Sequence, residues 1–160
     1  RETPFLYQGE EIGMTNFLFQ DETQLRDVES LNLLAQARKD GREAWAWNGI
    51  RKKGRDNART PMQWDASANA GFTAGTPWID VNSNYRQINV REAQADPDSI
   101  LHFYRKLLAL RQSSDALRSG TFRLLLPEHP QLLAYERACG EERIRVLSRL
   151  PGSAASGREY

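Results

Sequence analysis

The segment of this chain best equipped for chemistry runs from Arg55 to Trp64, Arg-Asp-Asn-Ala-Arg-Thr-Pro-Met-Gln-Trp, and Asn69-Ala70-Gly71-Phe72 follows it closely. It combines two guanidinium groups, two side-chain amides and an indole ring. Guanidinium groups are rigid forks of donors that match carboxylates or vicinal hydroxyl groups, and an aromatic ring offers a flat apolar surface. This combination suits a ligand that carries many hydroxyl groups, such as a sugar.

Arg55 and Arg59 are four residues apart, so on a helical turn they would share a face. Both could instead form ion pairs with Asp56, Asp65 or the acids near the start of the chain. The amides and the indole that crowd the same segment favour ligand binding.

Cleavage of a glycosidic bond needs two carboxyl groups that flank it. Nothing in their spacing nominates a pair among the candidates, which are Glu10, Glu11, Asp27, Glu29 and Asp56. Glu10 and Glu11 are adjacent, so in a strand they would point to opposite faces. The spacing therefore nominates no catalytic residue.

Other chemically versatile side chains are scarce. His102 and His129 are isolated, and Cys139 is the single cysteine. The chain has no Ser-His-Asp grouping and no Gly-rich phosphate loop. We therefore expect no metal site and no cofactor. A lone cysteine rules out an internal disulfide and favours a reducing, cytoplasmic location.

Composition narrows the partners. The 160 residues carry 22 Lys and Arg against 21 Asp and Glu, a net charge of +1, which gives no basis for binding nucleic acid or a membrane. Hydrophobic content is 39% and mean hydropathy is −0.68, low for a chain that buries its own core. The first residue is Arg1, and we expect further sequence before it.

The elements that position these residues begin with Pro4–Tyr7, an apolar run that predicts a short buried parallel strand. The polar residues Gln8, Glu10 and Glu11 would then lie at its carboxyl end, where α/β barrels carry their sites. A surface turn with solvated acids is the alternative.

Three helices are predicted. Arg26–Lys39 has a three-and-four spacing on one face, made of Val28, Leu31, Leu34, Ala35 and Arg38. Arg42–Ile50 is a weaker candidate, because its two tryptophans are two residues apart and cannot share one core stripe. In Asp96–Arg111, Asp96 can cap the helix and Pro97 fits the first position, ahead of an apolar stripe.

Residues 54–90 are loop-like, and we expect most of their aromatic rings to pin the loop to the protein, namely Trp64, Phe72, Trp78 and Tyr85. After Gly120, three strand-like runs separated by turns predict an antiparallel sheet, namely Thr121–Leu126, Gln131–Arg137 and Arg143–Leu150.

Several stretches carry a family resemblance. Thr3–Met14 resembles the eighth barrel strand of α-amylase-type glycoside hydrolases. Five further segments narrow this resemblance to one branch of the family, which contains α-glucosidases, oligo-1,6-glucosidases and trehalose-6-phosphate hydrolases. These segments are Arg26–Asn32, Arg55–Trp64, Asn69–Thr73, Pro77–Ile79 and Ile88–Val90. The match runs in order to about Leu150.

The resemblance implies an α/β fold. Residues 1–117 would be the last β/α unit of a (β/α)8 barrel with a long insertion, and residues 118–160 an incomplete antiparallel β domain. It implies a retaining reaction on α-1,6 or α-1,4 glucosidic bonds of short gluco-oligosaccharides, with catalytic residues on earlier strands, so the chain alone is expected to be inactive. By the same resemblance Arg55 holds the terminal glucose, Glu29 contacts the neighbouring sugar, and Arg59 is a second contact or a support.

Alternatives stay open. Trehalose-6-phosphate hydrolase fits the segment Arg26–Asn32 at least as well, and sucrose isomerase fits less well. A sugar-binding or structural module without enzymatic activity is the remaining possibility.

Overall fold

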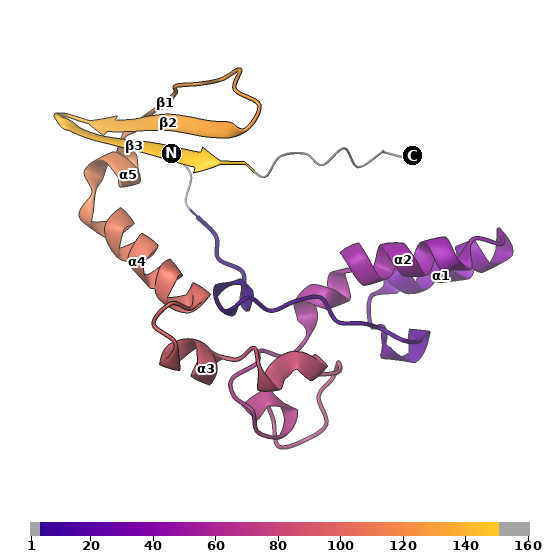
Figure 1. The fold of residues 1–160 in the computed structure, drawn as a ribbon. Helices are drawn as coiled ribbons and strands as arrows, with labels where there is room; N and C mark the ends of the chain where they lie inside the picture. Colours follow the sequence, from indigo (N-terminus) through magenta and orange to yellow (C-terminus); the bar gives the residue numbers. More distant parts are fainter. Residues whose placement is uncertain (1–3, 151–160) are drawn as a thin grey trace. The chain divides into compact units, whose positions relative to one another are not determined.

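A computed structural model describes residues 4–150, which form two compact units (Figure 1). The first, here the loop-rich unit, comprises residues 5–104. The second, here the sheet unit, comprises residues 105–150 together with residue 4. Within residues 4–150, no helix combines the length and apolar character needed to cross a membrane.

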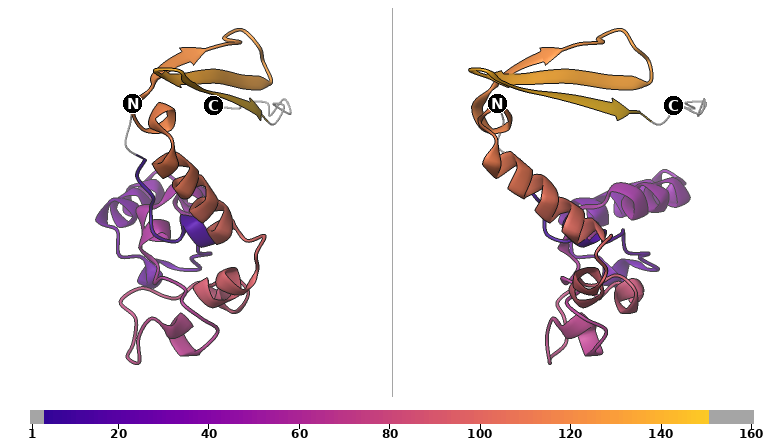
Figure 2. Two further views of the ribbon diagram at one scale, coloured as in Figure 1. Left: turned by 90° about the vertical axis from the view of Figure 1, so that its left-hand side faces the viewer. Right: turned by 60° about the vertical axis from the view of Figure 1, so that its left-hand side comes forward.

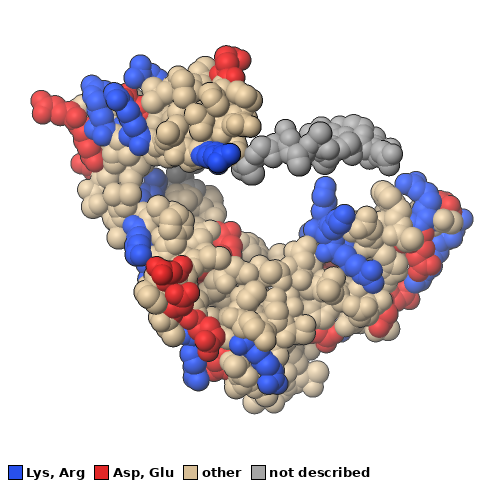
Figure 3. Space-filling model, in the orientation of Figure 1, with Lys and Arg blue, Asp and Glu red and all other residues tan. Residues whose placement is uncertain are grey.

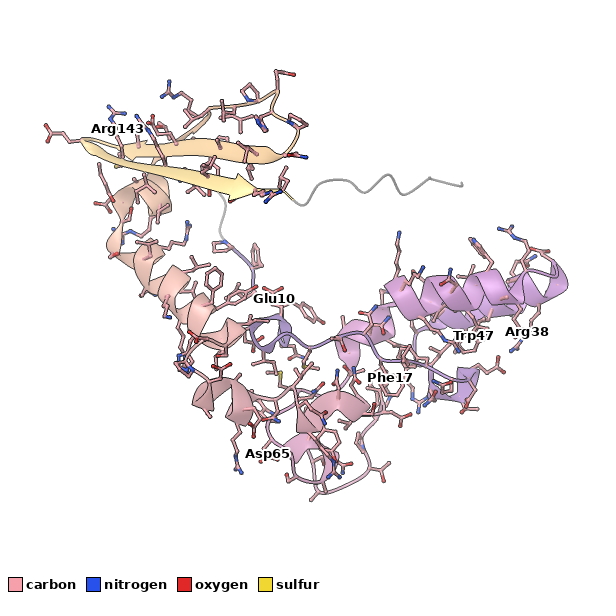
Figure 4. The ribbon with its side chains drawn as sticks, viewed as in Figure 1. Glu10, Phe17, Arg38, Trp47, Asp65 and Arg143 are labelled. Atoms are coloured by element: carbon pink, nitrogen blue, oxygen red, sulfur yellow. The ribbon has the colours of Figure 1, made fainter. Side chains whose placement is uncertain are left out.

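Two helices, α1 (Val28–Lys39) and α2 (Glu43–Lys53), form the core of the loop-rich unit, which confirms both predicted helices. They bury a cluster made of Phe19, Leu25, Leu34, Ala37, Ala46, Ile50 and Ile79, with Phe17 and Trp47 packed against it (Figure 4). The predicted face of α1 is wrong except for Leu34, because the helix buries Ser30, Leu34 and Ala37 instead. Small alanines on both helices allow close packing.

The segment after α2 is built from short 3₁₀ helices, η3 (Arg55–Arg59), η4 (Ala68–Gly71) and η5 (Ser83–Arg86). Buried amides hold it together. Gln63 is fully buried and its Nε2 donates to the carbonyl of Ile88, while Asn82 Nδ2 donates to the carbonyl of Thr15 at 3.0 Å. The expectation that rings pin this loop is wrong for three of them, which are 49–62% exposed, namely Trp64, Phe72 and Trp78.

The predicted strand over Pro4–Tyr7 is absent, and this part of the fold prediction is wrong for the described chain. A strand requires a second strand paired with it through backbone hydrogen bonds, and within residues 4–150 this segment has no such partner; Phe5 is 92% exposed. The 3₁₀ helix η1 (Glu10–Ile12) follows, flanked by Gly9 and Gly13 with φ of 95° and 73°. These left-handed conformations favour glycine.

The predicted helix Asp96–Arg111 is present with later bounds. Helix α3 (Val90–Ala95) precedes a turn, and α4 (Ile100–Ser113) begins four residues later than expected. Asp96 accepts from Asp98 N at 2.9 Å within that turn, and the hydroxyl of Ser99 accepts from His102 N at 3.4 Å. Ser99 therefore takes the capping role predicted for Asp96. None of the described residues of α4 is buried, and Ile100, Phe103 and Leu107 of its apolar stripe are 46–58% exposed.

The sheet unit contains α5 (Asp115–Ser119) and three antiparallel strands in the order β1-β2-β3, namely β1 (Thr121–Leu124), β2 (Leu132–Cys139) and β3 (Glu142–Arg149) (Figure 2). All three predicted strands are confirmed with shifted bounds. Gly140, with φ of 57°, opens the tight β2–β3 turn. Glu142 ties α5 to this hairpin, accepting from Ser114 Oγ at 2.6 Å and Ala116 N at 3.0 Å.

Candidate functional site

The turn η3 is fixed in place by one buried carboxylate and one amide. Asp56 is 1% exposed, and its Oδ2 accepts the backbone N–H of Arg26 at 2.7 Å and that of Asp27 at 2.8 Å. Asn57 Nδ2 donates to the Gly54 carbonyl at 3.0 Å, while its Oδ1 accepts from Phe17 N at 3.0 Å. The start of α1 and the turn that carries both arginines are thereby joined.

The three residues predicted to bind sugar come together in this structure. Arg55 Nη2 lies 2.9 Å from Glu29 Oε1 and 3.1 Å from Asp27 Oδ1. Arg59 Nη1 lies 3.3 Å from Asp56 Oδ1 and 3.7 Å from Asp27 Oδ1. We call these five residues the charged cluster. Of the ion-pair alternatives, Arg59 with Asp56 is observed, whereas Asp65 pairs with Arg91.

Asp27 is the buried centre of the charged cluster and caps α1. Its Oδ2 accepts from Ser30 N at 3.1 Å and from Ser30 Oγ at 2.9 Å. Burial raises the pKa of Asp27, but the hydrogen bonds from Ser30 and the charges of Arg55 and Arg59 outweigh it, so the pKa lies below its ordinary value. Asp27 therefore stays ionised and holds both guanidinium groups.

The carboxyl groups left open by the sequence have partners as well. Glu11 Oε2 accepts from Gly9 N at 2.6 Å, and Glu10 Oε1 accepts from the hydroxyl of Tyr104 at 3.2 Å; Glu10 is labelled in Figure 4. Asp27 and Asp56 hold backbone. In the described part of the chain, each of these five acids therefore has a hydrogen-bond or ion-pair partner.

A cleft of about 460 Å³ lies beside η3. Most of its lining residues carry polar side chains, although apolar atoms contribute more of the lining surface; the lining comprises Tyr7–Glu10, Met14–Asn16, Lys52–Arg55, Asn57, Ala58, Thr60 and Met62. The hydroxyl of Tyr7 donates to the Ala58 carbonyl at 3.0 Å and ties the two walls together. Arg55 also lines a second hollow of about 270 Å³ with Asp27 and Glu29. Arg55 thus stands where two hollows meet, and it is half-exposed.

Arg59 lies apart from both hollows. It lines a small cavity of about 110 Å³ together with Phe72 and Trp78. Its closest polar partners are the two buried carboxylates of the charged cluster.

The sequence names Asp27 and Asp56 as candidate acids, but it does not predict that both are buried and hold backbone N–H groups of the site. For Asp27 a signal existed, because it stands three residues before Ser30 at the start of a predicted helix, as a capping residue does. The reach of Asp56 across 30 residues to Arg26 has no local signature. Among residues 4–150, no three His, Cys, Asp or Glu residues are grouped as a metal site would require.

Comparison with known proteins identifies the family to which this chain belongs. Residues 1–120 match the alpha-amylase catalytic domain. The chain belongs to the α-amylase family of glycoside hydrolases, within the branch that contains oligo-1,6-glucosidases and trehalose-6-phosphate hydrolases.

Three relatives show how close the likeness is. The chain is 49% identical over 148 residues to the oligo-1,6-glucosidase of Parageobacillus thermoglucosidasius, covering 91% of this chain and 26% of that protein. It is 50% identical over 149 residues to the trehalose-6-phosphate hydrolase of Escherichia coli K12, covering 92% and 27%. The structure of trehalulose synthase MutB from Pseudomonas mesoacidophila MX-45 matches with a TM-score of 0.87 at 39% identity, covering 94% and 27%.

The chain thus spans about a quarter of the length of these relatives. Variants of MutB have been solved in complex with glucose and with sucrose.

Proposed function

We propose that this chain forms one wall of the substrate pocket of a retaining, cytoplasmic α-glucosidase that acts on α-1,6 and α-1,4 bonds of short gluco-oligosaccharides. The observation that carries the proposal is the contact of 2.9 Å between Arg55 and Glu29 at the edge of the cleft beside η3. Both side chains are exposed, at 53% and 77%, so both can address a ligand.

Arg55 is suited to hold a sugar because its guanidinium group has five N–H donors. Its contacts to Asp27 and Glu29 are both made through Nη2, which leaves donors on the other nitrogens for ligand hydroxyls. Glu29 adds acceptors beside these donors, and a pair of adjacent sugar hydroxyls can use both. The buried carboxylate of Asp27 fixes the guanidinium before the ligand arrives, which lowers the entropic cost of binding.

Bond cleavage is assigned to other parts of the protein. A retaining glycosidase needs two carboxyl groups about 5–5.5 Å apart, and Asp27 and Asp56 are occupied by backbone and arginine partners. We infer that these groups lie in the sequence that relatives have beyond the matched quarter. On this proposal residues 1–117 complete a barrel and residues 118–160 begin a β domain.

Because the chain is also similar to a trehalose-6-phosphate hydrolase and to a trehalulose synthase, trehalose 6-phosphate and sucrose are the alternative substrates. Turnover of isomaltose, maltose, sucrose and trehalose 6-phosphate by the full-length protein chooses among them. Hydrolysis of isomaltose as the preferred substrate supports the proposal, and preference for trehalose 6-phosphate replaces it. No turnover of any of the four leaves the chain as a binding or structural module.

The test of the site is Arg55→Ala in the full-length protein. Loss of a charged hydrogen bond to a buried ligand costs about 2–4 kcal/mol, so kcat/KM is expected to fall about 30- to 1,000-fold. Arg91→Ala is the matched control, because Arg91 is an exposed arginine of the same unit that pairs with Asp65. Unchanged kinetics in Arg55→Ala would mean that Arg55 does not bind the ligand and forms only a structural ion pair.

A further inference from the structure

One face of the sheet unit gathers arginines around a single acid. Strand register pairs Glu136 of β2 with Arg123 of β1 on one side and with Arg145 of β3 on the other. Directly paired residues of antiparallel strands lie on the same face. Arg143 lies two positions from Arg145 along β3 and therefore shares that face.

The contacts confirm this grouping. Glu136 Oε1 lies 3.1 Å from Arg123 Nη2 and 3.9 Å from Arg143 Nη1, and Oε2 lies 3.0 Å from Arg145 Nε. The Glu136 side chain is 6% exposed, whereas the three arginine side chains are 59–72% exposed. The acid is therefore the buried centre, and the guanidinium groups form an outer layer that faces solvent. We call these four residues the arginine face; Arg143 is labelled in Figure 4.

The charges of the arginine face do not balance. Within residues 4–150, Glu136 is the only carboxylate closer than 4 Å to any of the three guanidinium groups. The hydrogen bond from Arg145 and the charge of Arg123 hold the pKa of Glu136 below its ordinary value. With Glu136 ionised, three cations surround one anion, and two positive charges remain. Figure 3 shows Lys and Arg side chains gathered on the surface of the sheet unit.

We propose that the arginine face binds a small, doubly charged oxyanion of the phosphate-monoester type. Guanidinium groups match phosphate oxygens through parallel hydrogen bonds. Three of them, converging on one carboxylate, stand close enough to reach a single phosphate with the N–H groups that Glu136 does not use. The neighbouring pairs on this face are Thr121 with Ala138 towards one end and Ala134 with Leu147 towards the other, and the three arginine side chains stay 59–72% exposed between them.

This proposal does not rest on the proposed function, because none of its residues belongs to the charged cluster or the cleft. The competing explanation is a purely structural set of cross-strand ion pairs. Exposed pairs of that kind contribute little to stability, and one arginine would neutralise Glu136. The excess of two cations is what a structural role leaves unexplained and an anion site requires.

The experiment is calorimetric titration of the full-length Arg55→Ala protein with inorganic phosphate, at constant ionic strength set by sodium chloride. The Arg55→Ala background removes the proposed sugar contact from the measurement. Saturable binding of one phosphate is expected. Arg123→Gln and Arg145→Gln are each expected to weaken it about tenfold or more, since each removes a hydrogen bond to a charged ligand.

Arg118→Gln is the matched control. Arg118 is an exposed arginine of the same unit that pairs with Asp115 on α5, so phosphate affinity in this variant is expected to be unchanged. Glucose 6-phosphate is expected to bind as phosphate does, and glucose is not. Thermal melts of all three variants should match the parent, because each replaced side chain is mostly exposed.

Four results would overturn the proposal. They are no saturable binding to the parent, unchanged affinity in Arg145→Gln, an equal loss in Arg118→Gln, or binding only of an extended polyanion such as a short single-stranded DNA.

Discussion

Replacement of Asp56 by alanine tests how the candidate site is held together. Asp56 Oδ2 satisfies the backbone N–H groups of Arg26 and Asp27, at a position that is 1% exposed. In Asp56→Ala both donors lose their acceptor, and each buried unsatisfied group costs about 1–3 kcal/mol. The lost contact to Arg59 adds little, because that side chain is 37% exposed. The total is about 4 kcal/mol, large against the stability of most domains.

Asp56→Asn separates hydrogen bonding from charge. The amide oxygen can still accept from the two backbone donors, so the free energy of unfolding is expected to fall by about half as much as in Asp56→Ala. Because Asp56 joins the turn of Arg55 to the helix of Glu29, KM is expected to rise in both variants even where the protein stays folded.

The assay is urea unfolding of the full-length protein followed by tryptophan fluorescence, together with amide hydrogen exchange of residues 26–59. Exchange in this range is expected to accelerate in Asp56→Ala. Asp80→Ala is the control, since Asp80 is exposed and its side chain accepts from Gln24 Nε2 at 2.8 Å. If Asp56→Ala destabilises the protein no more than Asp80→Ala, the reasoning from buried donors is refuted.

Three further predictions follow from other parts of the chain. Because the folded-state pKa of Asp27 is depressed, its contribution to stability is present above its unfolded pKa of about 3.9 and is lost as pH falls through the folded value. Acid unfolding of Asp27→Asn should accordingly depend less on pH than that of the parent, and equal slopes would contradict this. A Cβ on Gly120 would lie 2.7 Å from the carbonyl oxygen of Ala138 and closer still to that of Ala116, so Gly120→Ala should lower the melting temperature. At Gly49 an added Cβ would meet nothing within 4 Å beyond its own helix backbone, so Gly49→Ala should raise the free energy of unfolding by about 0.5–1 kcal/mol. Equal melting temperatures for the two variants would contradict the close packing at Gly120. The 160-residue chain alone should hydrolyse no nitrophenyl α-glucoside and should aggregate, because large apolar side chains of α4 and the sheet are exposed; turnover or a sharp monomeric melt would overturn this.

Where local pattern decides structure, the sequence predicts it well. Alternating side chains and turn residues locate the three strands, and the three-and-four spacing locates α1, although it predicts the wrong buried face. Prediction fails where a contact distant in sequence decides. Pro4–Tyr7 has the composition of a strand but lacks a paired strand in the described chain. The cap of α4 fails for a local reason, because Ser99 takes the place predicted for Asp96 and its hydroxyl also donates to the Ala93 carbonyl at 2.6 Å.

The candidate site follows the same rule. The residue types of Arg55, Glu29 and Arg59 suggest sugar binding, but only the fold brings Arg55 to within 2.9 Å of Glu29. Asp56 is a candidate acid and ion-pair partner in the sequence, but its burial and its hold on the start of α1 are not predictable, because a carboxylate that accepts hydrogen bonds from distant backbone looks in sequence like any other surface acid.

Ion pairing and ligand binding are compatible at Arg55, and their energies assign different roles to the two arginines. The pair of Arg55 with Glu29 joins two exposed side chains, and such a pair contributes about 0–1 kcal/mol. A ligand hydroxyl can therefore compete for this guanidinium group at little cost. Arg59 instead faces the buried carboxylates of Asp27 and Asp56, and within residues 4–150 it is the only cationic side chain paired with Asp56, so moving it away would leave that buried charge without an ion-pair partner. We therefore infer that Arg55 addresses the ligand and that Arg59 supports the acids holding Arg55. On this inference Arg55→Ala chiefly lowers kcat/KM, and Arg59→Ala chiefly lowers the free energy of unfolding.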